Sequence, residues 1–367
     1  MKIFCQGQEL SSAISTVIKA VSTKTTNPIL EGVKITAKED SLTLIGTDGE
    51  LAIEKKIVAD VKIEGKIVVP GRFFSEYIKR LEEEEIELFY NDKTNQVKVK
   101  YTDSEVDISC MNSSEFPSIQ KIDNPEYFEI KEKQLKDIIQ KTIFSVSTED
   151  TRPVLKGCLF EIENSKLTSV ALDGYRLALA KKDLEKTTSE KKIIVPGRSL
   201  NEISKLLEET DDKLKVYTQE NYLMLQKNST KVITRLLDGE FINYKQIIPS
   251  EPTSVLTVNK KHLEEALERA SILSRESNEN SVKFKITEEI LTVEAKSEIG
   301  NVKENITTVL KGQDLEISFD ARFIKSCLRV IADEFLKLDF TTSINPTVIK
   351  PNEGDDYLYL ILPLKQQ

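Results

Sequence analysis

The sequence contains only one histidine and four cysteines, and both shortages limit its chemistry. The histidine, His262, lies beside two lysines in KKHLEEALERA, a segment typical of an exposed helix. A histidine-rich metal site is therefore excluded, and a histidine-based triad would depend on this one residue. The cysteines are far apart and form no C-x-x-C pair, which argues against a zinc ribbon or a redox motif.

Long apolar runs are also missing. None approaches the ~20 residues that a membrane-spanning helix needs. The N-terminal MKIFCQGQEL has no apolar stretch followed by a small-residue cleavage site, so we expect a cytoplasmic protein. Of the 367 residues, 39% are apolar and 31% charged, which predicts two or three domains with substantial cores.

What the chain does contain is an internal repeat. TNPILEGVKI, starting at Thr26, returns as TRPVLKGCLF, starting at Thr151. The dipeptides Asp48-Gly49 and Asp173-Gly174 are separated by the same 125 positions, and the tetrapeptide VPGR recurs at 69–72 and 195–198. An offset of 125 or 126 held through different motifs indicates duplicated structural units.

A third copy is fainter. SVKFKITEEILTVEAKSEIGN, from Ser281, resembles the paired strands, and ISFDARFIKSCLRVIADE, from Ile317, takes the place of the VPGR segment. The period is too long for a solenoid, so each copy is a whole domain. The polar, proline-containing stretches IQKIDNPEY and IIPSEPTSV mark the joints, which gives predicted domains at 1–124, 125–252 and 253–367.

Each copy combines short alternating strands with two amphipathic helices. Segments such as SLTLIG, KVKVKY and KLKVYT alternate with a period of two. One-sided apolar stripes with helical spacing occur at 10–21, 74–81, 135–142, 200–207, 263–270 and 324–331. Six helices lying on antiparallel sheets predict an α+β fold.

The two Asp-Gly dipeptides allow two interpretations. They fall between strands, where Asp-Gly is typical of a tight hairpin turn. Alternatively, Asp48 and Asp173 could be catalytic or metal-binding carboxylates. The hairpin context favours the turn.

Net charge is −9, which by itself argues against a nucleic-acid binder. Basic residues nevertheless recur on the polar faces of the predicted helices and in the adjoining turns. Any exposed helix face is charged, but a repeat can place such faces on one common surface, which would suit a phosphate backbone. The candidate DNA-binding residues are Lys24, Arg72, Lys79, Lys141, Arg152, Arg198, Lys205, Arg269 and Arg322.

The motifs NPIL, GTDGE, VPGR, ALDGYRLAL, LLDGEFINYKQIIP and YLILPL, in this order, resemble the bacterial sliding clamps, the β subunits of replicative DNA polymerase III. The resemblance covers essentially the whole chain. It implies a head-to-tail homodimer of three-domain subunits that forms a ring around duplex DNA and tethers the polymerase. It also implies no catalysis, no cofactor and no metal.

The resemblance further implies a groove for short linear peptides from client proteins, with Arg176 near its rim for polar pairing. Aliphatic residues dominate the set, as an anchor pocket requires. Leu172 replaces the threonine common in the family, and Gln246 stands where some members have arginine. The implied groove residues are Leu155, Leu172, Gly174, Tyr175, Arg176, Leu177, Ile242, Ile247, Ile344, Pro346, Leu360, Leu362, Pro363 and Leu364.

By the same resemblance, an edge strand with Val106 and Ile108 meets a helix with Ile272 and Leu273 in the dimer. The implied partners are a second copy, duplex DNA of any sequence, the polymerase catalytic subunit, the clamp loader, and other replication and repair proteins. Two rival functions remain open: a metal-dependent hydrolase that uses the Asp-Gly sites, and a scaffold that binds only proteins. No P-loop, H-E-x-x-H or G-x-S-x-G motif supports a hydrolase.

Overall fold

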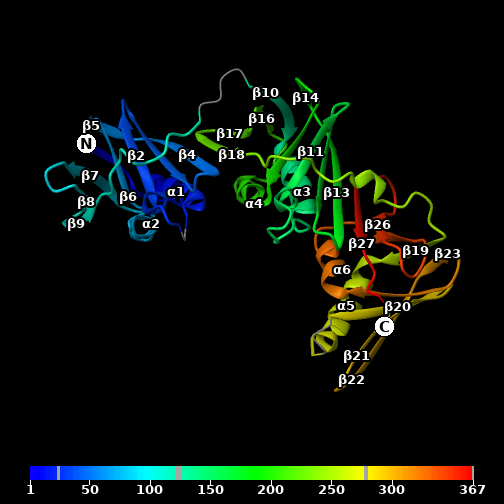
Figure 1. The fold of residues 1–367 in the computed structure, drawn as a ribbon. Helices are drawn as coiled ribbons and strands as arrows, with labels where there is room; N and C mark the ends of the chain where they lie inside the picture. Colours follow the sequence, from blue (N-terminus) through cyan, green and yellow to red (C-terminus); the bar gives the residue numbers. More distant parts are fainter. Residues whose placement is uncertain (23–24, 121–124, 277–279, 366–367) are drawn as a thin grey trace. The chain divides into compact units, whose positions relative to one another are not determined.

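A computed structural model describes residues 1–22, 25–120, 125–276 and 280–365 (Figure 1). Lys24 lies outside these residues. The chain divides into two compact units. Unit 1 contains Met1–Glu132, Glu185–Ser189 and Lys205–Leu236, and unit 2 contains the remainder. The predicted middle range 125–252 contributes to both units, because its strands join two different sheets.

Unit 1 contains two antiparallel sheets. The first has the order β5-β1-β7-β8-β9, and the second has the order β14-β10-β16-β17-β18-β4-β3-β2-β6. The first sheet comprises β1 (Lys2–Gln6), β5 (Asp60–Ile63), β7 (Glu85–Asn91), β8 (Gln96–Tyr101) and β9 (Ser104–Ser109). The second comprises β2 (Gly32–Lys38), β3 (Ser41–Thr47), β4 (Leu51–Val58), β6 (Gly65–Pro70), β10 (Glu126–Lys131), β14 (Lys186–Thr187), β16 (Lys213–Gln219), β17 (Tyr222–Lys227) and β18 (Thr230–Arg235).

Unit 2 also contains two antiparallel sheets, of orders β15-β11-β12-β13-β27-β26-β25-β19-β23 and β22-β21-β20-β24. The first comprises β11 (Gly157–Glu163), β12 (Lys166–Leu172), β13 (Arg176–Asp183), β15 (Lys191–Pro196), β19 (Ser254–Asn259), β23 (Val309–Lys311), β25 (Phe335–Phe340), β26 (Thr347–Pro351) and β27 (Tyr357–Ile361). The second comprises β20 (Ser281–Ile286), β21 (Ile290–Ser297), β22 (Gly300–Thr307) and β24 (Leu315–Asp320).

Six α-helices occur in the described residues, as the apolar stripes predicted. Each buries its stripe, because the apolar side chains recur on the face that meets a sheet. In unit 1, α1 contacts α2 and the strands β3 and β4, and in unit 2, α5 contacts α6 and the strands β20 to β22 (Figure 1). The helices are α1 (Gly7–Val17), α2 (Gly71–Ile78), α3 (Glu132–Ile143), α4 (Gly197–Leu206), α5 (Lys260–Glu276) and α6 (Ala321–Leu328). Among the described residues, no helix combines the length and the apolar character needed to cross a membrane.

The predicted repeat is confirmed element by element. The strands β11, β12 and β13 begin 125 residues after β2, β3 and β4. The strands β20, β21 and β22 begin 124 residues after β11, β12 and β13. Short 3-10 helices precede the first two sets, η2 (Pro28–Glu31) and η3 (Pro153–Lys156). The third copy therefore shares the plan even where its sequence has diverged.

Strand pairing links successive copies. In unit 1, β4 from the first copy pairs with β18 from the second, and in unit 2, β13 from the second pairs with β27 from the third. The corresponding strands that remain, β9 and β22, lie at the edges of their sheets. Each presents unpaired backbone groups to a further strand.

Candidate functional sites

The two Asp-Gly dipeptides form hairpin turns, as predicted. One Asp173 carboxylate oxygen accepts hydrogen bonds from the backbone N–H groups of Tyr175 and Arg176, at 3.0 and 3.1 Å. Gly174 has φ +92°, a backbone conformation that glycine adopts without strain. Asp48 holds its own turn in the same way. Both carboxylates thus have structural partners, and within the described ranges no cluster of three metal-binding side chains occurs.

A small apolar cavity of about 60 Å³ lies beside the β12–β13 turn and the end of β27. All of its lining residues belong to the groove predicted from the sequence. They are Leu172, Gly174, Tyr175, Arg176, Leu177, Ile247, Leu360 and Leu362. The strand pairing of β13 with β27 brings together residues far apart in the sequence, such as Leu177 and Leu360.

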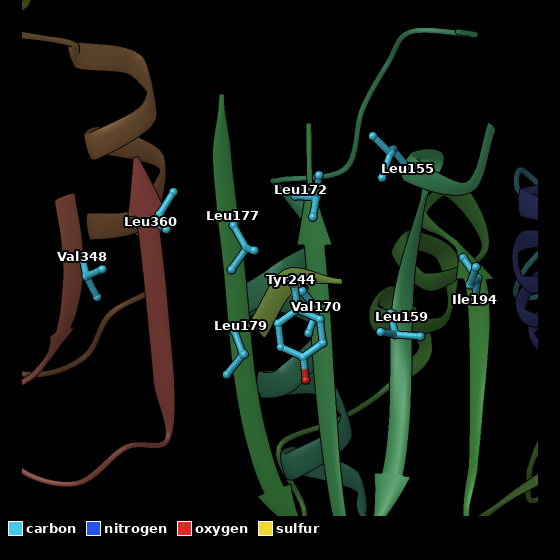
Figure 2. Close-up of a cluster of buried hydrophobic side chains, with 10 residues drawn as sticks. All are labelled: Leu155, Leu159, Val170, Leu172, Leu177, Leu179, Ile194, Tyr244, Val348 and Leu360. Carbon is cyan, nitrogen blue, oxygen red and sulfur yellow. The ribbon is translucent and has the colours of Figure 1, made fainter. Parts of the chain in front are cut away.

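The floor of this cavity belongs to the core of unit 2. Figure 2 shows Leu172, Leu177 and Leu360 with their side chains in one buried cluster, which also contains Leu155. These leucines are therefore both core and pocket wall. A substitution at one of them changes stability as well as the groove.

Tyr244, in the short 3-10 helix η4 (Tyr244–Gln246), is buried in this core and holds the segment around it, residues 242–247, in place. Its hydroxyl donates to the buried Glu161 carboxylate at 2.6 Å. Burial opposes ionisation of Glu161, but hydrogen bonds from Lys192 and Tyr244 outweigh it and lower the pKa of that carboxyl. The anchored segment carries the predicted groove residue Ile242, which packs against the cluster, and Ile247, which lines the cavity.

The rim of the cavity is exposed and partly aromatic. The Tyr175 ring stacks on Phe323 of α6 with 6.0 Å between centroids. Leu362 is 37% exposed and Leu364 similarly so, whereas Ile344 is 78% exposed and does not line the cavity. The remaining predicted residues, Pro346 and Pro363, are half-buried.

Arg176 lines the cavity, and its side chain also pairs with groups of the same chain. Its guanidinium donates to Asp173 at 3.0 Å, to the Ser326 hydroxyl at 2.7 Å and to the Phe144 carbonyl at 2.7 Å. The guanidinium carbon also lies over the Phe323 ring, at 4.9 Å. Arg176 therefore holds the turn against α6 and the end of α3, because each of its three side-chain nitrogens donates to a protein acceptor.

Sequence reasoning missed the residues that hold Arg176. Phe144, Phe323 and Ser326 lie far from it in the sequence and carry no motif of their own. A signal did exist for Phe323, because FDARF aligns with VPGRF and places an aromatic residue directly after the helix-start arginine.

Arginines occupy the same position in three helices. Arg72, Arg198 and Arg322 follow the buried first residue of α2, α4 and α6, and all three side chains are exposed. Lys79 directly follows α2, Lys205 lies near the end of α4, and both are exposed. The repeat thus places basic side chains at equivalent points of the plan.

Arg322 and two further predicted DNA-binding residues, Arg269 and Lys141, form ion pairs with carboxylates. Arg322 pairs with Asp320 at 2.6 Å, and Arg269 forms two hydrogen bonds with Glu304. Lys141 is largely buried and pairs with Asp137 at 2.9 Å. Arg152, by contrast, is exposed at the start of η3. The predicted DNA-binding residues therefore differ in how far nearby carboxylates already neutralise their charge.

The predicted interface residues lie on the two edge strands or beside them. Val106 is half-buried on β9, and Ile272 is strongly exposed on α5, the helix that contacts β22. Leu273 is half-buried. Ile108 is only 4% exposed, so its side chain already belongs to the core of unit 1.

Comparison with known protein families gives matches along nearly the whole chain. Three family models cover the chain in order: the N-terminal domain of the DNA polymerase III beta subunit at residues 1–120, its central domain at 129–243 and its C-terminal domain at 245–365.

Relatives and solved structures agree with the family models. The beta sliding clamp of Halalkalibacterium halodurans is 36% identical over 96% of both chains, and that of Staphylococcus aureus strain N315 is 30% identical over the same share. The crystal structure of the Bacillus subtilis DNA polymerase sliding clamp matches with a TM-score of 0.97 at 31% identity, and covers 100% of both chains. The Thermotoga maritima DNA polymerase III beta subunit matches with a TM-score of 0.93 at 28% identity over the same coverage.

Proposed function

The chain belongs to the bacterial sliding clamps, the beta subunits of DNA polymerase III, and we propose here which of its residues perform the work of that family. It is a ring-forming dimer that encircles duplex DNA, works with DNA polymerase and makes replication processive, without catalysis of its own. The observation that carries this conclusion is the threefold plan, because three family domains follow one another over residues 1–365. We retain 1–124, 125–252 and 253–367 as the three domains, and the cytoplasm as the site of action.

DNA contact is assigned to basic residues at equivalent points of the repeat. Arg72, Arg152 and Arg198 are exposed at helix starts, with Lys79 and Lys205 nearby, and Lys24 adjoins the first copy of the plan. Arg269, Arg322 and Lys141 contribute less than the exposed Arg152, because carboxylates offset their charge. Such side chains contact phosphates rather than base edges, so binding is indifferent to sequence and steeply salt-dependent.

Client docking is assigned to the cavity beside Leu177 and Leu362. Its apolar walls suit the anchor side chains of a short linear peptide, such as those of the polymerase catalytic subunit, the clamp loader and other replication or repair proteins. The equivalent positions on β3, β4 and β18 hold Thr47, Ala52 and Arg235, which build no apolar wall. Among the described residues, the equivalent place in unit 1 therefore offers no such groove.

Ring closure is assigned to the edge strands β9 and β22. If the rule that pairs β4 with β18 and β13 with β27 continues into a second copy, β9 of one chain pairs with β22 of the other. The register carried over from those pairs places Val106 opposite Val302 and Glu105 opposite Lys303. Both valines are half-buried in the single chain and become covered on pairing. A heterologous contact of this kind closes after two copies.

The test is topological. A dimer by light scattering, loaded onto nicked circular DNA, should stay bound through a high-salt wash. It should leave once the circle is cut, because a ring slides off an end. Retention after linearisation would contradict encirclement and favour ordinary surface binding.

A further inference from the structure

Several apolar side chains outside the groove are exposed in the described residues, and two of them occupy positions that the repeat relates to a packed pair. Phe73, on α2, is 51% exposed, and Ile299, in the turn between β21 and β22, is 75% exposed. Phe73 also lines a cavity of about 460 Å³, together with Ile18, Val21 and Met111. Single exposed apolar residues are common on protein surfaces, so what distinguishes this pair is its place in the repeat rather than its exposure alone.

The repeat shows what covers the equivalent pair. Ile299 corresponds to Tyr175, since the β21–β22 hairpin lies 124 residues after β12–β13. Phe73 corresponds to Phe323, since each directly follows the arginine near the start of its helix. Tyr175 and Phe323 stack on each other where β13 pairs with β27.

Backbone bonding supports the same correspondence. The N–H of Leu362 donates to the Tyr175 carbonyl at 2.9 Å, and in unit 1 the N–H of Arg235 donates to the Glu50 carbonyl at 2.9 Å. Each bond joins a residue at the end of the last strand of one copy, Arg235 in β18 or Leu362 just after β27, to the turn residue of the copy before it. The remaining members of this series are Ser109, at the end of β9, and Ile299.

We propose that Ile299 of one chain packs on Phe73 of a second copy, as an apolar contact flanking the β9–β22 strand pair. The proposal rests on the ring dimer described above and adds a residue pair to it. A second copy is the occupant because β9 and β22 are the edge strands that the pairing rule leaves without partners. Val302 lies on β22 and pairs with β21 in this hairpin. In the proposed dimer, pairing of β22 with β9 therefore also brings the hairpin turn, with Ile299, beside Phe73.

Cross-linking tests the contact directly. The chain with Phe73→Cys and Ile299→Cys, treated with a short bismaleimide, should run at dimer mass on a denaturing gel. Phe73→Cys with Ile290→Cys is the matched control, because Ile290 is also exposed but starts β21, at the opposite end of the hairpin. The native cysteines are all buried, and each single variant measures their background.

The outcomes separate this inference from the proposed ring. A dimeric protein without cross-linking would overturn the Phe73–Ile299 contact and leave the ring intact. A cross-linked product at monomer mass would place the contact within one chain and also overturn the inference. A monomeric wild-type protein would overturn the ring itself.

An equilibrium measurement provides a second test. Ile299→Asp should raise the dimer dissociation constant about tenfold or more in sedimentation equilibrium, because a charge would face an aromatic ring in a desolvated contact. Val309→Asp, at a similarly exposed position on β23, should leave the constant unchanged. Equal constants for Ile299→Asp and the wild type would overturn the contact.

Discussion

The backbone N–H of Leu362 donates to the carbonyl oxygen of Tyr175 across 2.9 Å. This bond ties the end of β27 to the β12–β13 turn, so the two walls of the apolar cavity are held together by main-chain contacts. The groove is therefore preformed by strand pairing. Substitutions of the groove side chains can therefore change which peptides bind without removing the groove.

Leu362 provides the sharper test of that groove, because Leu177 is a core residue and Leu362 is not. Leu362→Asp should lower the affinity for a polymerase-derived peptide by at least about tenfold, since the carboxylate would lose its hydration against an apolar anchor side chain. Fluorescence anisotropy measures the affinity. Dimer mass and melting temperature should match those of the wild type.

A matched control separates this effect from added charge alone. Val309→Asp places a carboxylate at an exposed apolar position on β23 and should leave peptide affinity unchanged. Wild-type affinity in Leu362→Asp would move the docking site elsewhere.

The proposed strand register predicts a charge swap at the seam. In unit 1, Lys231 faces Glu54 with 3.7 Å between the charged groups, and the register places Glu105 opposite Lys303 of the second copy. Lys303→Glu should weaken the dimer by about 1 kcal/mol, roughly fivefold in Kd, because like charges then face each other. Adding Glu105→Lys should restore most of the loss. Sedimentation of both variants that shows no recovery would exclude this register.

The basic residues should differ in their contribution to DNA binding. Arg152→Ala should lower the salt dependence of binding by about 0.9 in the slope of log K against log salt, the amount expected for one phosphate contact. Lys141→Ala should change it less, because Asp137 and the Tyr357 ring already hold that ammonium group. Titrations of duplex DNA at several salt concentrations measure both slopes. Equal slopes for the two variants would show that the ion pair of Lys141 does not reduce its contribution to DNA binding.

The buried Glu132 carboxylate should stabilise unit 1 in a pH-dependent way. Burial alone would raise its pKa, but hydrogen bonds from Lys227, the Glu208 N–H and the Thr210 hydroxyl lower it below its ordinary value of 4.5. Because the folded state holds the lower pKa, this stability is present above 4.5 and is lost as pH falls through the folded value. Glu132→Gln should therefore cost about 3 kcal/mol at pH 7 and less at pH 3.

Glu208→Gln is the matched control for Glu132→Gln. Glu208 also pairs with Lys227, at 3.2 Å, but its side chain is 71% exposed. Its loss should cost under about 1 kcal/mol, because water screens an exposed pair. Urea unfolding at both pH values measures the difference, and equal losses in the two variants would refute the role of burial.

The sequence predicted the cavity lining well but misjudged individual side chains. The leucines at the ends of β12, β13 and β27 were identified through the resemblance to the family, which implied the groove residues. The hydrogen bond from Arg176 to Ser326 could not be identified in this way, because the two residues are 150 positions apart in the sequence. The burial of Ile108 was missed for a related reason, since an edge strand still has one face against its own core.

The repeat, the six helices and the Asp-Gly turns could be predicted from the sequence, because apolar periodicity and turn chemistry act between near neighbours in the chain. The pairing of β4 with β18 and of β13 with β27, and hence which strands stay at the edges, became known from the folded structure. Those pairings join residues more than a hundred positions apart. Any alternating strand offers the same backbone groups to a partner, so the choice among partners depends on how all the sheets pack together.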